Sequence, residues 1–131
     1  EAVENYIQAY GEKHDIQQVA IDRWQGASTI NRLVGNGLDC IGFGQGFSSM
    51  SGSTKIVESY IEAGKLNHKG NPVLAWNASN LIVEEDATGN VKPSKAKSSE
   101  KIDGLVCLIM AAAIQSTAEK QLEQSWEIFE I

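Results

Sequence analysis

Two aspartates stand at positions where a carboxylate is able to do chemistry. Asp22 directly follows the apolar segment 16–21, which predicts a strand, and Asp103 precedes Gly104 and the most apolar stretch of the chain. In an open α/β sheet, ligands bind beyond the carboxyl ends of the strands. Carboxylate oxygens are the ligands that hard divalent cations prefer, and such cations activate water for phosphodiester cleavage. Both aspartates are therefore candidate metal ligands with a hydrolytic role.

Each aspartate also has a purely structural interpretation. Asp22 can cap the following helix or pair with Arg23, and Asp103 can stabilise the first turn of its own helix. For either residue alone, its position favours the structural role. The metal role requires that the fold bring the two carboxylates together, because carboxylates that share one point repel each other unless a cation lies between them.

A lysine-rich segment interleaved with serines leads up to Asp103. Its four lysines are Lys92, Lys95, Lys97 and Lys101. As a group they suit contacts with a phosphate backbone beside a metal site, whereas a solvated loop is the alternative for each lysine alone. His68, in a separate polar loop, is a further candidate for phosphate contact or proton transfer, with an exposed loop histidine as the alternative.

The elements that must position these residues follow from the spacing of apolar residues. Helical spacing predicts helices over 2–13, over 27–35, from Ser51 or Ser53 to Ala63, over a short segment from Pro72, and over 102–120. Strands are predicted over 16–21 and 39–43, and a hairpin joins 81–85 to 90–92 through Gly89. Helices that alternate with buried strands indicate an α/β fold with a parallel component. For the tail, 126–131, an edge strand and a docking peptide both remain open.

Composition narrows the class of protein. The 131 residues, 42% hydrophobic and 21% charged, suit a single globular domain over 1–131, and no apolar run approaches the ~20 residues of a membrane span. A net charge of -6 argues against a protein that coats DNA, yet it permits a local basic patch. No GxxxxGK[ST] motif is present, which excludes a phosphate loop for ATP. The start shows neither an initiator methionine nor a signal peptide. We therefore interpret the sequence as a fragment of a longer chain or a processed product.

Four segments, in this order, resemble motifs of the large terminase subunits of tailed phages. They are Val-Ala-Ile-Asp-Arg-Trp at 19–24, Gly-Gln-Gly-Phe-Ser-Ser-Met-Ser at 44–51, the segment 64–76 that ends in Asn-Pro-Val-Leu-Ala-Trp, and Glu-Lys-Ile-Asp-Gly-Leu-Val at 100–106. Together they span nearly the whole chain. Their combination is specific, although each motif alone is weak.

The resemblance implies the C-terminal nuclease domain of a DNA-packaging motor, with an RNase H-like mixed sheet flanked by helices. In that family three acidic residues bind Mg²⁺ or Mn²⁺ at a two-metal site and cut concatemeric double-stranded phage DNA. Asp22 matches the middle acid and Asp103 the last, whereas no residue matches the first, which lies on an opening strand. We therefore expect a partial domain that lacks its N-terminal strands, is catalytically impaired and can self-associate through an exposed sheet edge.

The same resemblance implies a setting in the cytoplasm of a bacterial host, without a membrane, where the full motor includes a small subunit and a portal. A non-catalytic docking module is the alternative function, and it is motivated by the apolar side chains in the tail 125–131. A different RNase H-like enzyme, such as a resolvase or integrase, is a weaker alternative. The segments at 44–47 and 70–76 count against it.

Overall fold

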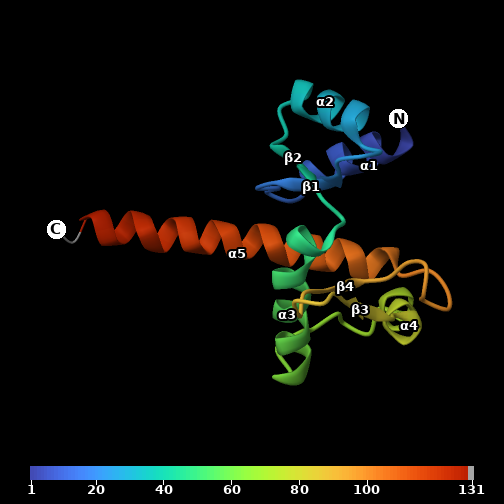
Figure 1. Cartoon of the computed structure of the whole chain (residues 1–131). Helices are drawn as coiled ribbons and strands as arrows, with labels where there is room; N and C mark the ends of the chain where they lie inside the picture. Colours follow the sequence, from blue (N-terminus) through green and yellow to red (C-terminus); the bar gives the residue numbers. More distant parts are fainter. Residues whose placement is uncertain (130–131) are drawn as a thin grey trace. The chain divides into compact units, whose positions relative to one another are not determined.

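The computed structural model describes the backbone of residues 1–129 and the side chains of residues 1–125 (Figure 1). The chain divides into two compact units, which we call unit 1 (Glu1–Gly44) and unit 2 (Gln45–Ile131). Each is described by itself below. The single domain over 1–131 stays a prediction. Among the described residues, no helix has both the length and the apolar character needed to cross a membrane.

Unit 1 is built around a pair of parallel strands. Helix α1 (Ala2–Gly11) is followed by strand β1 (Val19–Asp22), helix α2 (Ala27–Gly35) and strand β2 (Cys40–Phe43). The register pairs Val19 with Cys40 and Asp22 with Phe43. A helix between two parallel strands is the usual crossover, and it gives α2 one apolar face whose Leu33 is fully buried. The predicted parallel component is confirmed, although β1 begins three residues later than predicted and includes Asp22.

A half-buried ion pair joins α1 to α2. Glu4 is only 7% exposed, and its carboxylate accepts hydrogen bonds from the Arg32 guanidinium and, at 3.3 Å, from the Thr29 hydroxyl. The hydrogen bond from Arg32 is the main cause that lowers the pKa of Glu4 from 4.5 to about 2. Burial of a paired carboxylate in this way holds the first helix against the crossover helix.

This pair gives unit 1 a dependence on pH. Because the pKa of Glu4 is lowered on folding, its stabilisation is complete above about pH 4.5 and is lost as the pH falls through about 2. We expect Glu4→Gln to lower the thermal unfolding midpoint at pH 7, and the gap from the parent chain to close as the pH approaches 2. Glu12→Gln, at an exposed position of the same unit, is the matched control. A gap that stays constant over this range would contradict the role of the pair.

Unit 2 joins three helices to a hairpin. Helix α3 (Phe47–Glu62) and helix α4 (Pro72–Asn80) precede strands β3 (Val83–Glu85) and β4 (Val91–Pro93), and helix α5 (Asp103–Phe129) ends the unit. The strands pair antiparallel, and the turn between them has Gly89 at a φ of 82°, as predicted. The first half of α5 packs against α3 and α4, while its second half extends beyond the other elements of unit 2 (Figure 1). The core side chains are Met50, Val57, Ile102, Leu105, Val106, Ile109 and Met110.

The predicted start of α3 at Ser51 or Ser53 is wrong, because the helix begins at Phe47 after Gly46. The hydroxyl of Ser53 donates to the Met50 carbonyl inside the helix. The hydroxyl of Ser51 accepts the N–H of Val91, at 3.1 Å, and so ties α3 to the hairpin. These serines are buried packing residues rather than helix caps.

The predicted end of the last helix is also corrected. Helix α5 continues to Phe129, so the edge strand considered for 126–131 is wrong over 126–129, while 130–131 lie outside the described residues. Helix propagation explains the difference, because each added residue gains a backbone hydrogen bond, and the stretch 111–124 is rich in helix-forming Ala, Gln, Glu and Leu.

Candidate functional site

Asp22 lies at the carboxyl end of β1, as predicted. Its Oδ1 accepts the N–H of Trp24 at 3.0 Å, and its backbone carbonyl accepts the N–H of Gly26 at 2.9 Å. A Cβ at Gly26 would collide with Ile21 and with the carbonyl oxygen of Asp22, so this tight turn requires glycine. Helix α2 has no side-chain cap, and within unit 1 the described side chains show no ion pair between Asp22 and Arg23. Neither structural alternative weighed from the sequence is thus observed, although Asp22 does shape a turn.

Asp103 is the first residue of α5, and its side chain is 62% exposed. The Nζ of Lys95 lies 2.9 Å from its Oδ1. The hydrogen bond and the charge of Lys95, with a smaller contribution from the charge of Lys101, lower the pKa of Asp103 below its usual value. The carboxylate is therefore ionised at neutral pH and open to solvent, as a ligand for a hard cation must be.

Asp103, Lys95 and Lys101 line one polar hollow. Its volume is about 340 Å³, and Ser98, Glu100 and Ile102 complete the lining. Among the described side chains of unit 2, Lys101 forms no ion pair, so its ammonium group is available to an anion. A carboxylate flanked by two ammonium groups in an open hollow suits a phosphodiester that is bridged to the carboxylate by a cation.

The other two lysines of the predicted set are committed elsewhere. Lys92 lies opposite Glu84 in the hairpin and pairs with it at 3.0 Å, with its ammonium group over the ring of Phe47. Lys97 lies 3.6 Å from the same Glu84 carboxylate. A phosphate contact by either lysine must compete with Glu84, whose pKa these partners lower. Their role in DNA binding stays a prediction.

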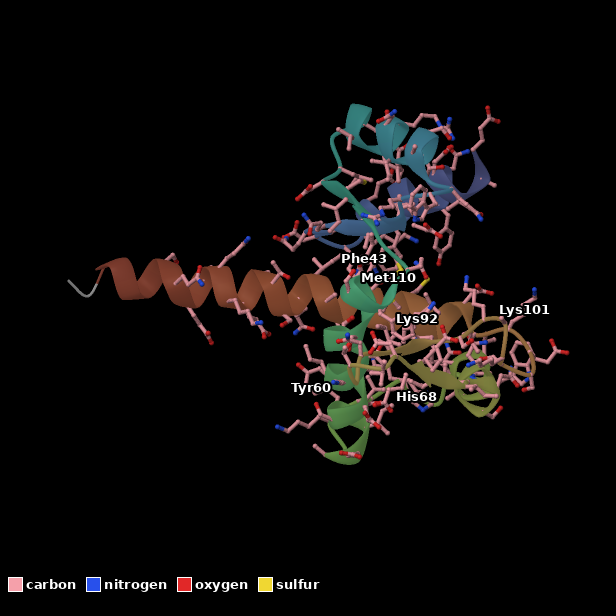
Figure 2. All side chains as sticks on the ribbon, in the orientation of Figure 1. Phe43, Tyr60, His68, Lys92, Lys101 and Met110 are labelled. Atoms are coloured by element: carbon pink, nitrogen blue, oxygen red, sulfur yellow. The ribbon has the colours of Figure 1, made fainter. Side chains whose placement is uncertain are left out.

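His68 lies apart from this hollow. It is exposed in the loop between α3 and α4, and it lines a smaller hollow of about 250 Å³ with apolar neighbours that include Leu66 and Leu74. Figure 2 shows it well separated from Lys101. The hollow beside Asp103 does not include His68 among its lining residues. Its contact with phosphate stays a prediction.

Two asparagines of α4 hold the segment that carries Asp103, and the sequence interpretation missed them. The side-chain amides of Asn77 and Asn80 both donate to the Lys101 carbonyl at 3.0 Å, and the N–H of Gly104 donates to Oδ1 of Asn77 at 2.8 Å. Asn77 is 3% exposed and Asn80 8%. The sequence signal that was overlooked is a pair of amide side chains three residues apart, on one face of a short helix.

The two predicted metal ligands belong to different units, Asp22 to unit 1 and Asp103 to unit 2. Among the described residues, no group of three or more His, Cys, Asp or Glu side chains is gathered as a metal cluster. Each aspartate fits a divalent cation by its chemistry: the oxygen donors suit Mg²⁺ or Mn²⁺, and each carboxylate stands at the end of a regular element. Their joint role stays a prediction.

A solved structure with a similar fold indicates the class of protein to which the chain belongs. The structure is similar to a crystal structure of the HK97 bacteriophage large terminase, with a TM-score of 0.78 and 32% identity over 86% of this chain and 24% of that chain. This match, with the mixed α/β elements, supports the RNase H-like class predicted from the sequence. The family described as "Terminase large subunit, endonuclease domain" matches residues 1–119, and the chain belongs to this family. The predicted resemblance is thereby confirmed.

Two curated relatives agree with this assignment. The chain is 35% identical over 103 residues to the terminase large subunit of Enterobacteria phage HK97, which covers 74% of this chain and 20% of the relative. It is 33% identical over 109 residues to protein YmfN of Escherichia coli strain K12, covering 81% of this chain and 24% of that protein. The chain thus spans no more than a quarter of the length of either relative.

Proposed function

We propose that this chain supplies Asp22 and Asp103 to the divalent-metal site of a DNA-packaging endonuclease that hydrolyses the phosphodiester bonds of concatemeric double-stranded DNA. The observation that carries the proposal is the hollow at the start of α5. There an exposed, ionised Asp103 lies beside Lys95 and Lys101, in a chain of the terminase endonuclease family. The paired lysine charges supply the local basic surface that the net charge of -6 does not.

The role proposed for each group follows from its chemistry. When bound, Mg²⁺ or Mn²⁺ supplies the activation of water and the stabilisation of the leaving oxygen. Asp22 and Asp103 present carboxylate oxygens to the cation, and Lys101 binds a phosphate oxygen of the backbone. Lys95 lowers the pKa of Asp103 and balances its charge while the carboxylate has no other partner. With Asp103 holding a cation, Lys95 would be available to bind a second phosphate oxygen.

Plasmid cleavage in Mn²⁺ tests this function. We expect cleavage by a version extended N-terminally to restore an opening strand with the first acid, which we call the extended protein. The 131-residue chain, with two of three carboxylates, should cleave at least about 100-fold more slowly, because a missing ligand costs more than the 10–100-fold loss of an outer-shell partner. Equal rates for the two proteins would overturn the three-carboxylate account.

A docking role is the second candidate, and the second half of α5 favours it. This part of the helix extends beyond the rest of unit 2 and leaves Leu122 61% exposed (Figure 1). We propose that it helps to dock the domain on the small subunit or portal of the motor. Deletion of 125–131 should then abolish that association, measured by sedimentation, and leave Mn²⁺-dependent cleavage unchanged. Retained association after the deletion would refute this role.

A further inference from the structure

The start of α5 has no cap of its own. The carbonyl of Ile102 accepts the N–H groups of Leu105 and Val106, so Ile102 occupies the cap position before Asp103. Its apolar side chain is 2% exposed and offers no oxygen to the free N–H groups of the first turn. The acceptor comes instead from Asn77 on α4, whose Oδ1 accepts the N–H of Gly104 at 2.8 Å. The first turn of α5 is therefore capped by a neighbouring helix.

The Asn77 side chain also binds the backbone on the N-terminal side of Asp103. Nδ2 of Asn77 donates to the Lys101 carbonyl, so one buried amide fixes the peptide groups before and after the Ile102–Asp103 pair. Asn80 adds a second hydrogen bond to the Lys101 carbonyl and makes none to Gly104. With Ile102 anchored in the core, the backbone that carries Asp103 has little freedom, although its carboxylate remains exposed.

Gly104 is shaped to this contact. A Cβ at Gly104 would lie 2.7 Å from Oδ1 of Asn77, closer than real Cβ contacts allow. Any side chain at this position must therefore push the Asn77 amide away from the N–H that it caps. The glycine that follows Asp103 thus has a definite physical reason, which is the close approach of α4.

We propose that Asn77 is a positioning residue that aligns Asp103 for metal binding, and this inference rests on the proposed function, in which Asp103 is a ligand. Asn77 is itself too buried to be a ligand, and both ends of its amide are already engaged. A metal ligand must be held within about 0.5 Å of its productive position, and residues that orient ligands contribute about 10–100-fold to metal affinity.

A Mn²⁺ titration of the 131-residue chain tests the inference. The readout is the paramagnetic broadening of the amide signals of residues 101–105, which reports metal at Asp103 rather than overall folding. We expect Asn77→Ala to raise the midpoint about 10-fold or more. Asn80→Ala, which removes one bond to Lys101 and leaves the cap on Gly104, should raise it less. Val57→Ala destabilises the core of the same unit and should leave the midpoint unchanged in the folded protein.

Further variants extend the test, and Gly104→Ala keeps it decisive if Asn77→Ala fails to fold. Gly104→Ala should weaken binding like Asn77→Ala, because its new Cβ displaces the same amide. The double variant Asn77→Ala, Gly104→Ala should bind Mn²⁺ no more weakly than Asn77→Ala alone, because the Cβ at position 104 then no longer meets the Asn77 amide.

The outcomes separate the inference from the function on which it rests. Asp103→Asn is measured in parallel. If Asp103→Asn abolishes the broadening while Asn77→Ala and Gly104→Ala bind like the parent, Asn77 has no positioning role and the proposed ligand stands. If Asp103→Asn itself leaves the midpoint unchanged, Asp103 is not a ligand and both proposals fail.

Discussion

Asp103→Asn in the extended protein is expected to reduce Mn²⁺-dependent plasmid cleavage by at least about 100-fold. The amide keeps the size of the side chain and one acceptor oxygen but removes the charge that a cation needs. Helix α5 should form as before, because its first turn is capped by Asn77 and not by the side chain of Asp103. The measurement is the initial rate of plasmid nicking and linearisation at a fixed Mn²⁺ concentration.

Glu100→Gln is the matched control for this variant. Glu100 lines the same hollow and is exposed, yet it matches no acid of the family motif. The control removes one negative charge at nearly the same place in the chain and should change the rate by no more than a few-fold. A loss shared equally by both variants would show that the hollow needs negative charge in general rather than a ligand at Asp103.

Asp22→Asn is expected to cause a loss as large as that of Asp103→Asn, although the two residues lie in different units. Two ligands of one metal cluster act together, so the double variant should be about as slow as either single variant. Losses that multiply in the double variant would contradict a shared site, because independent sites contribute additively to the activation free energy. The same plasmid assay provides all four rates, and Asp15→Asn, in an exposed loop of unit 1, is the control.

Much of the fold follows from local sequence. The predicted bounds of α1, α2, α4 and the hairpin lie close to those observed, because residues with turn or cap chemistry mark where these elements begin or end. The apolar faces that predicted α1 and α4 are not buried, since Val3 and Val73 are exposed. The Asn71 side chain caps α4 just before Pro72, and Gly89 closes the hairpin at positive φ. Such signals lie within a few residues of the element that they define.

The errors arose where tertiary contacts decide the structure. Ser51 has the chemistry of a helix cap, yet its hydroxyl binds Val91, forty positions later in the chain. Lys92 lies opposite Glu84 in the hairpin register, and the sequence interpretation did not foresee this partner. No local pattern reveals either partner, because both depend on which elements pack together.

In the candidate site, too, local sequence predicted some residues, whereas those that depend on tertiary contacts were missed. Asp22 and Asp103 were found from their positions at the ends of elements, and the structure places both there. Asn77 was missed, because the carbonyl and the N–H that it binds lie 24 and 27 residues further along the chain. Functional side chains can thus be proposed from sequence, whereas the residues that orient them require the packed structure.

We propose that Asp22 and Asp103 hold one metal cluster. The most direct test replaces Mg²⁺ with Fe²⁺ in the extended protein and adds ascorbate and peroxide, so that radicals made at the metal cut the nearby backbone. We predict cuts near residue 22 and near residue 103, both suppressed by excess Mg²⁺ and both lost in Asp103→Asn. Cuts near only one of the two aspartates, or cuts near residue 22 that persist in Asp103→Asn, would contradict the shared site.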